Sequence, residues 1–142
     1  MTDSDQPGAP SYKDLSLLGS SAPLPSSPEE AQLETFGNPS PERDYVIELE
    51  VADFSSLCPV TGQPDAARVL ITYVPDVLCV ETKSLKFYLA AWRNTPAFNE
   101  AIVNRILDDL VKALAPRKAT VRGAFAARGG IKLTAEASHE KA

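Results

Sequence analysis

The spacing of the apolar residues changes twice along this chain, and this change strongly constrains the fold. Apolar and polar residues alternate from Tyr45 to Val51, while residues 67–74 are apolar and rich in β-branched side chains, so both segments are predicted to be strands. Apolar residues recur at helical spacing between residues 82 and 114, and alternation returns over residues 119–125. With a fourth strand beginning at Ile131, the pattern predicts an α+β fold, ββααββ. We expect an antiparallel four-stranded sheet with two helices on one face.

Two helices are predicted within the central segment. Thr82 is a plausible N-cap for the first helix, since a threonine hydroxyl can accept a hydrogen bond from a free amide of the first turn. The second helix is predicted to begin at Thr95 and Pro96 and to end before Pro116. Its apolar stripe steps by four residues: Phe98, Ile102, Ile106, Leu110 and Leu114.

The 142 residues suit one compact domain preceded by an arm. Residues 1–42 contain seven of the twelve prolines and many serines, so we expect a partly disordered Pro/Ser-rich arm. Residues 43–136 are predicted to form the catalytic domain and residues 137–142 a C-terminal tail.

Composition excludes several classes of function. The net charge of −5 gives no basic field for nucleic acid or an acidic membrane, and no apolar run reaches membrane-spanning length. The polar, acidic N-terminus does not resemble a signal peptide, so we expect a cytoplasmic protein. The single histidine, His139, makes a histidine-based metal site or a Cys–His catalytic pair very unfavourable.

Cys58 lies in a segment, Ser56 to Asp65, that is rich in turn-forming residues. Two prolines and a glycine restrict the backbone there, so the thiol is expected on a rigid loop with a carboxyl group seven residues away. Taken alone, this position fits a reactive thiol as well as a buried structural cysteine. Cys79, beside Val80 in an apolar stretch, is interpreted as a small buried hydrophobic residue.

Several motifs, taken together and in order, resemble one family. They are Arg43-Asp44-Tyr45, Ser56-Leu57-Cys58-Pro59, Thr61-Gly62-Gln63-Pro64-Asp65, Glu81-Thr82-Lys83-Ser84-Leu85-Lys86-Phe87-Tyr88, Trp92-Arg93-Asn94, Asn104-Arg105-Ile106 and Arg128-Gly129-Gly130-Ile131. Across residues 33–133 the chain resembles the NADPH-dependent 7-cyano-7-deazaguanine reductases, the QueF family of nitrile reductases in queuosine biosynthesis. The resemblance is to the short, single-module type. It implies the tunnelling fold, homo-oligomers built as stacked pentameric rings, and active sites between subunits.

The resemblance also implies the chemistry. Members reduce the nitrile of 7-cyano-7-deazaguanine to the amine of 7-aminomethyl-7-deazaguanine with two NADPH, and act on the free base rather than on tRNA. It places the nucleophile at Cys58, whose thiolate would form a thioimide that accepts hydride more readily than a nitrile. It makes Asp65 the proton-transfer residue, whereas the local sequence alone also fits a loop-capping aspartate.

Ligand contacts are implied in the same way. The resemblance assigns the substrate to Val80, Glu81, Thr82, Asn99 and Glu100, and NADPH to Lys83, Lys86, Arg128 and Gly129. A carboxylate can accept two hydrogen bonds from the deazaguanine edge, and two ammonium groups can hold phosphates. Without the resemblance, these glutamates and lysines would be read as solvated side chains at a helix start or on a surface. The chain has no glycine-rich Rossmann fingerprint.

One residue departs from the family pattern. Members commonly have histidine just before the glutamate that is Glu100 here, and this chain has Asn99. Because asparagine cannot carry a proton near neutral pH, a non-catalytic deazapurine-binding homologue with the same fold is the alternative function. A zinc hydrolase of the same fold, as in GTP cyclohydrolases, is disfavoured by the missing histidines.

Overall fold

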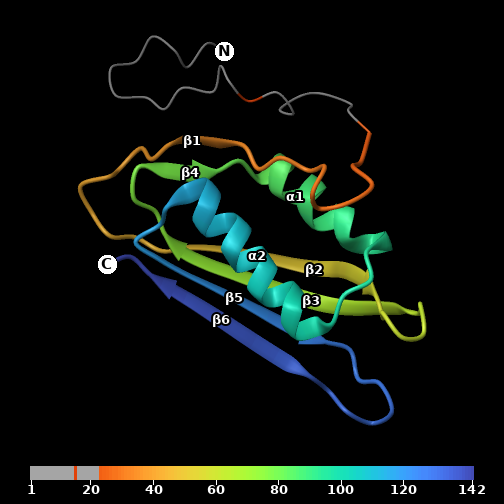
Figure 1. Cartoon of the computed structure of the whole chain (residues 1–142). Helices are drawn as coiled ribbons and strands as arrows, with labels where there is room; N and C mark the ends of the chain where they lie inside the picture. Colours follow the sequence, from red (N-terminus) through yellow and green to blue (C-terminus); the bar gives the residue numbers. More distant parts are fainter. Residues whose placement is uncertain (1–14, 16–22) are drawn as a thin grey trace.

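The computed structural model describes residue 15 and residues 23–142 of the chain. The predicted order of strands and helices is confirmed, with two short strands added (Figure 1). The elements are β1 (Thr35–Gly37), β2 (Ile47–Leu57), β3 (Pro64–Val74), β4 (Leu78–Val80), α1 (Thr82–Ala90), the 3-10 helix η2 (Ala91–Asn94), α2 (Asn99–Leu114), β5 (Lys118–Phe125) and β6 (Thr134–Glu140).

The main sheet has four antiparallel strands in the order β2-β3-β5-β6, and a two-stranded sheet joins β1 to β4. Apolar residues of α1 and α2 share one buried cluster with residues of β3 and β5, so both helices cover the same face of the main sheet (Figure 1). β2 and β6 are the edge strands, and each has one side that pairs with no other strand among the described residues.

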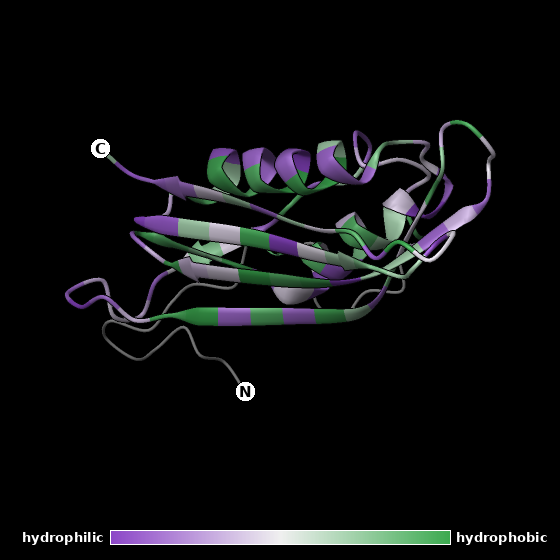
Figure 2. Ribbon diagram, turned by 90° about the horizontal axis from the view of Figure 1, so that it is seen from below, coloured by the Kyte–Doolittle hydropathy of each residue, from purple (hydrophilic) through white to green (hydrophobic). Residues whose placement is uncertain are grey.

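Alternation along the strands determines which side chains enter the core. On β3, the side chains of Ala67, Val69, Ile71 and Tyr73 are all at most 6% exposed, while the residues between them are less buried. Hydrophilic and hydrophobic residues alternate along the strands in Figure 2. The period of two seen in the sequence therefore correctly predicts the buried face of the sheet.

Helix α2 lies close to the sheet because β5 carries a glycine beneath it. A Cβ built on Gly123 would lie 2.9 Å from Val103 Cγ2 and 2.8 Å from Phe125 Cε2. Ile102, Ile106, Leu110 and Leu114, four members of the predicted stripe, are all at most 1% exposed. Truncating one such residue to alanine typically costs about 2–5 kcal/mol of stability.

The N-cap of α1 is Glu81, not Thr82 as the sequence predicts. Its two carboxylate oxygens accept hydrogen bonds from the amides of Lys83 and Ser84, each at 2.7 Å. The Ser84 hydroxyl donates in return to the Glu81 carbonyl at 2.7 Å. A carboxylate near a helix N-terminus also interacts favourably with the helix dipole, so Glu81 is the better cap.

The predicted start of α2 at Thr95 is also wrong, because the helix begins at Asn99. Thr95 instead ends η2, donating its amide to the Trp92 carbonyl at 2.9 Å. The Leu57 amide donates to Thr95 O at 3.2 Å, and Leu57 O accepts from the Ala97 amide at 3.1 Å. The segment around Pro96 is therefore extended and attached to the end of β2, and Phe98, predicted to be part of the buried stripe, is 62% exposed.

Strand boundaries differ from the predicted ones near the turns. β2 continues to Leu57 and β3 begins at Pro64, so the segment from Ser56 to Asp65, predicted to be a loop, contains a shorter turn of residues 58–63. β6 begins at Thr134 rather than Ile131.

The ends of the domain extend beyond the predicted boundaries. β6 runs to Glu140, through residues that the sequence places in a C-terminal tail. Residues 35–37, expected within the arm, form β1 against β4. Residues 1–14 and 16–22 lie outside the described residues, so their expected disorder stays a prediction.

Candidate active site

The turn between β2 and β3 holds Cys58 in a defined position. The Cys58 amide donates to Gln63 O at 2.8 Å, and the Gly62 amide donates to Cys58 O at 2.9 Å. Gly62 has a φ of +71°, which glycine adopts without the strain that a side chain would introduce. The turn therefore presents Cys58, which is partly exposed, at one end of the sheet.

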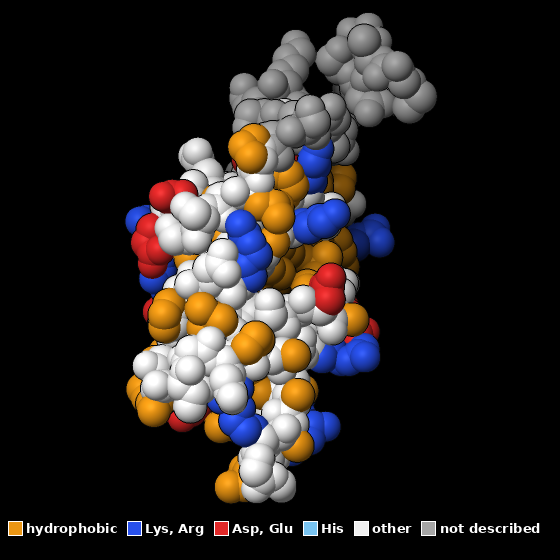
Figure 3. All heavy atoms as spheres, turned by 90° about the vertical axis from the view of Figure 1, so that its right-hand side faces the viewer, with side chains coloured by type: hydrophobic (Ala, Val, Ile, Leu, Met, Phe, Trp, Pro, Cys, Tyr) orange, Lys and Arg blue, Asp and Glu red, His pale blue; other side chains and the backbone are white. Residues whose placement is uncertain are grey.

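Three segments that are distant in sequence meet at this end of the sheet, and Figure 1 shows them together. They are the turn after β2, the start of α2 and the loop between β5 and β6, and they line a cavity of about 260 Å³. Five of the predicted site residues line it: Cys58, Asp65, Asn99, Glu100 and Arg128. Figure 3 views the molecule from this end and shows hydrophobic, Lys and Arg side chains on its surface.

The environment of Cys58 favours the thiolate. Hydrogen bonds from the Thr61 hydroxyl, the Thr61 amide and the Val60 amide lower the pKa of the Cys58 thiol to about 7, and Arg128 contributes a further hydrogen bond. Because the thiolate is the nucleophilic form of cysteine, a large fraction of Cys58 is reactive near neutral pH. Cys58 also differs from Cys79 in exposure, since Cys79 is only 3% exposed.

Thr61→Val tests the largest contribution to this pKa. Removing the hydroxyl takes away a hydrogen bond that stabilises the thiolate, so the pKa of Cys58 should rise and less thiolate should be present at pH 7. We expect the rate of Cys58 alkylation by iodoacetamide, followed against pH, to reach half its maximum at a higher pH than in the unmodified protein. Thr61→Ser, which keeps the hydroxyl, is the matched control. Superimposable pH profiles for Thr61→Val and the unmodified protein would contradict the role of this hydroxyl.

Asp65 points toward the helix-covered face of the sheet. It lies two residues before Ala67 in the inward series of β3, and its cross-strand partner is Ser56, whose side chain is fully buried. Its side chain is 16% exposed and forms an ion pair with Arg128, with Oδ1 2.7 Å from Nη2. The Asp65 carboxyl group, at an inward position near the start of β3, thus lines the Cys58 cavity.

Asn99 and Glu100 are the first two residues of α2. The Glu100 side chain is exposed, while the amide oxygen Oδ1 of Asn99 is buried and has no hydrogen-bond partner among the described residues. Phe98, the N-cap, forms no capping hydrogen bond through its side chain. The start of α2 therefore brings one exposed carboxylate to the cavity lining, together with an asparagine whose amide oxygen is unsatisfied.

The other predicted ligand residues lie elsewhere in the chain. Val80, Glu81, Thr82, Lys83 and Lys86 do not line the Cys58 cavity. Both oxygens of Glu81 cap α1, and the Val80 amide donates to the Tyr73 hydroxyl at 3.0 Å. The Lys83 ammonium lies 5.9 Å from the centre of the Phe87 ring.

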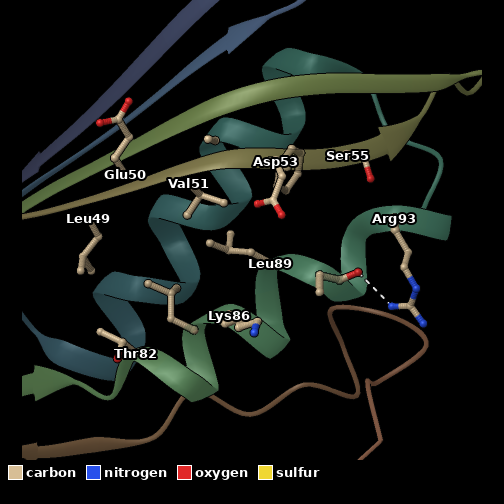
Figure 4. A pocket seen from close by; sticks show the side chains of 13 residues that line it. Leu49, Glu50, Val51, Asp53, Ser55, Thr82, Lys86, Leu89 and Arg93 are labelled. Atoms are coloured by element: carbon tan, nitrogen blue, oxygen red, sulfur yellow. Dashed lines mark hydrogen bonds between the residues drawn. The ribbon is translucent and has the colours of Figure 1, made fainter.

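A second cavity of about 440 Å³ lies between β2 and the helical segment α1–η2. Figure 4 shows Lys86 and Arg93 on the helical side, with Asp53 and Ser55 on the strand. Thr82 lines its far end. This cavity adds Arg93, from η2, to the predicted cations. Arg93 belongs to the Trp92-Arg93-Asn94 motif, which indicates the family but gives the residue no role.

Residues 15 and 23–142 contain no group of three or more His, Cys, Asp or Glu side chains placed to hold a metal ion. In the same residues, no helix is both long and apolar enough to span a membrane.

The fold and the first cavity define a class: an α+β protein of the tunnelling-fold type with a thiol and a carboxyl group in one site. A solved structure described as the archaeosine synthase QueF-Like in the apo form matches with a TM-score of 0.64, over 68% of this chain and 95% of that one. At 18% identity this likeness shows the fold alone.

Sequence comparison identifies the family. A family model described as QueF-like protein matches residues 64–142. The NADPH-dependent 7-cyano-7-deazaguanine reductase of Magnetococcus marinus is 49% identical over 85% of this chain and 94% of its own length. The enzyme of the same name from Alkalilimnicola ehrlichii is 54% identical over 77% of this chain and 84% of its own. The chain belongs to the QueF family.

Proposed function

We propose that this protein reduces 7-cyano-7-deazaguanine to 7-aminomethyl-7-deazaguanine, consuming two NADPH, in the cytoplasm. The observation that carries the proposal is the pairing of a thiol whose pKa is lowered to about 7 with the carboxyl group of Asp65 in one cavity. Relatives of 49% and 54% identity carry the name of this activity.

The reaction begins with addition of the Cys58 thiolate to the nitrile carbon. The new C–S bond forms as one C≡N π bond breaks, and Asp65, which has taken the thiol proton of Cys58, delivers it to the nitrile nitrogen to give a thioimide. Hydride from the first NADPH adds to the same carbon, and loss of the thiolate leaves an imine. Hydride from the second NADPH and further protons then give the amine, so that two hydrides are consumed for each nitrile.

Glu100 and Asn99 are proposed to hold the deazaguanine ring. The exposed Glu100 carboxylate can accept a bidentate pair from the N–H and amino donors of the base. The Asn99 amide, whose oxygen has no partner among the described residues, can add one hydrogen bond when its side chain turns toward the cavity. The substrate nitrile would then point toward Cys58 on the opposite wall.

The cofactor is proposed to place its phosphates near the helical lysines. Lys86 lies on the wall of the second cavity beside Arg93, and Lys83 lies one turn earlier on the same helix. The Arg93 guanidinium donates to the carbonyls of Ala90 and Pro25, so its position is fixed by the backbone. Gly129 is proposed as a further point of close approach to the cofactor.

A homo-oligomer would complete this site. β2 and β6 are edge strands with no outer partner in the described part of the chain, so they can pair between copies and join sheets into a ring. The family resemblance suggests two stacked pentamers. Because Glu81 and its neighbours do not line the Cys58 cavity, we propose that an adjacent subunit supplies them to it.

Co-expression of two inactive variants tests this sharing of the site. Cys58→Ala and Glu81→Gln subunits should together regain roughly a quarter of the normal activity, because some interfaces then combine an intact Cys58 with an intact Glu81. Cys58→Ala with Glu100→Ala is the control, since both residues line one cavity and an intact pair within one chain cannot arise. Activity is measured on the purified mixed oligomer. Absence of recovery with Glu81→Gln would place the site within one subunit.

The function itself is tested by mixing the protein with 7-cyano-7-deazaguanine and NADPH. We expect loss of nicotinamide absorbance with two NADPH oxidised per amine formed, as determined by mass spectrometry of the product. Binding of the substrate with no NADPH oxidation would instead support the non-catalytic deazapurine-binding alternative.

Asn99→His tests the departure from the family pattern. If the family histidine transfers a proton, restoring it should raise kcat by about ten-fold or more and leave the substrate KM nearly unchanged. Steady-state kinetics of both proteins give the comparison, and Asn99→Gln serves as a control that changes the side chain without adding a titratable group. An unchanged kcat in Asn99→His would show that this position only orients the substrate.

A further inference from the structure

Arg128 is held against the two residues that start the proposed reaction. Its Nη2 lies 2.7 Å from Asp65 Oδ1 and donates to the Pro64 carbonyl at 3.1 Å. The same side chain lines the cavity with Cys58 and helps to lower the pKa of its thiol. One guanidinium group is therefore paired with the carboxyl group in the cavity of the nucleophile.

The backbone around Arg128 explains this placement. The amide and carbonyl of Arg128 exchange hydrogen bonds with those of Ile131, at 2.9 and 3.0 Å. Gly129 and Gly130 between them have φ values of +58° and +79°, as a tight two-residue hairpin turn requires. A side chain at either position would be strained, although nothing lies within 4 Å of the built Cβ. The two glycines thus form the turn that presents Arg128.

The Arg128 guanidinium balances acidic side chains in the cavity lining. Asp65 from β3 and Glu100 from α2 both bring carboxyl groups to the lining, and Arg128 from the β5–β6 loop is the only Lys or Arg among the described residues that line it. Two carboxylates near a thiol oppose formation of the thiolate, and a neighbouring guanidinium favours it. Arg128 therefore offsets an otherwise negative site.

We propose that Arg128 is a positioning residue for nitrile addition, holding the Asp65 carboxyl group and the Cys58 sulfur in place for thioimide formation. This inference rests on the proposed function. In the step concerned, the Asp65 carboxylate takes the thiol proton of Cys58. Sulfur then bonds to the nitrile carbon as one C≡N π bond breaks, and Asp65 returns the proton to the nitrile nitrogen. The step involves no oxidation or reduction, so it takes place without NADPH. A role of Arg128 in this step is therefore separate from any contact with the cofactor. This role differs from the phosphate contact that the family resemblance assigns to the residue.

Thioimide formation without NADPH separates the two roles. The protein is mixed with 7-cyano-7-deazaguanine alone, quenched at intervals, and the Cys58 adduct is followed by mass spectrometry. We expect Arg128→Ala to slow adduct formation at pH 7 by about ten-fold to a hundred-fold, and Arg128→Lys to recover part of the rate by keeping the charge. Arg122→Ala, which removes an exposed arginine from β5, should leave the rate unchanged.

The pH dependence of Cys58 alkylation provides a second measurement that needs no substrate. Arg128→Ala should move the half-maximal rate to higher pH, whereas Arg122→Ala should not, and circular dichroism checks that both variants are folded. If Arg128→Ala matches the unmodified protein in adduct rate and pH profile but has a raised KM for NADPH, the residue is a cofactor contact and the inference is overturned. If the unmodified protein forms no adduct, the proposed function fails, while the alkylation profile still decides whether Arg128 acts on Cys58.

Discussion

Replacing Cys58 with alanine is expected to abolish formation of the amine, with a loss of at least about a thousand-fold in kcat. The nitrile carbon is a weak electrophile, and without the covalent thioimide no activated C=N bond is available to accept hydride. Amine production and NADPH oxidation are measured together with intact-protein mass spectrometry, which should detect no adduct. Because Cys58 is partly exposed in a turn, the variant should fold normally.

Cys79→Ala is the matched control for the nucleophile. Cys79 is 3% exposed and packs in the core, so its replacement should lower stability modestly and leave the adduct and the turnover intact. Amine formation by Cys58→Ala at the normal rate would mean that hydride adds directly to the nitrile, and the proposed mechanism would fail.

Asp65→Asn is expected to slow thioimide formation by about a hundred-fold to ten-thousand-fold. Asparagine has nearly the same shape and keeps an oxygen that can accept the hydrogen bond of Arg128, but it cannot transfer a proton at neutral pH. The rate of adduct formation without NADPH isolates this step from hydride transfer. The alkylation of Cys58 should continue in the variant, because the thiol itself is unchanged.

Asp108→Asn, an exposed change on α2, controls for the loss of one negative charge. A normal adduct rate in Asp65→Asn would remove Asp65 from proton transfer and leave solvent as the donor. Asp65→Asn should slow adduct formation more than Arg128→Ala does, because Asp65 itself transfers the proton, whereas Arg128 only positions Asp65 and Cys58.

Local patterns in the sequence predict the elements well where one face is buried. The period of two over β3 and the four-residue steps from Ile102 to Leu114 are confirmed, because each follows from the geometry of a strand or helix against one core. The helix starts are predicted wrongly for a different reason. Thr82 and Thr95 both have side chains that can cap a helix. At α1 the cap is instead Glu81, because its carboxylate reaches two amides. Before α2 the backbone at Thr95 and Ala97 forms hydrogen bonds with Leu57, so the helix begins later.

Part of the candidate site can be predicted from the sequence in the same way. The turn formers around Cys58 predict a presented thiol, and the inward phase of β3 extended back from Ala67 would have directed Asp65 toward the helices. The contribution of Thr61 to the pKa of Cys58 has no signal in the sequence, because it depends on how a six-residue turn folds its hydroxyl and amides around the sulfur.

The sequence by itself determined the order of the elements, the buried face of the sheet and the family, because these depend on short-range periodicity and on motifs read along the chain. Only the tertiary structure decided which of the motif residues meet. It brought Cys58, Asp65, Asn99, Glu100 and Arg128 to one cavity and left Glu81 as a helix cap outside it. The physical reason is that contacts between residues many positions apart depend on how strands pair and helices pack, and no local pattern encodes that geometry.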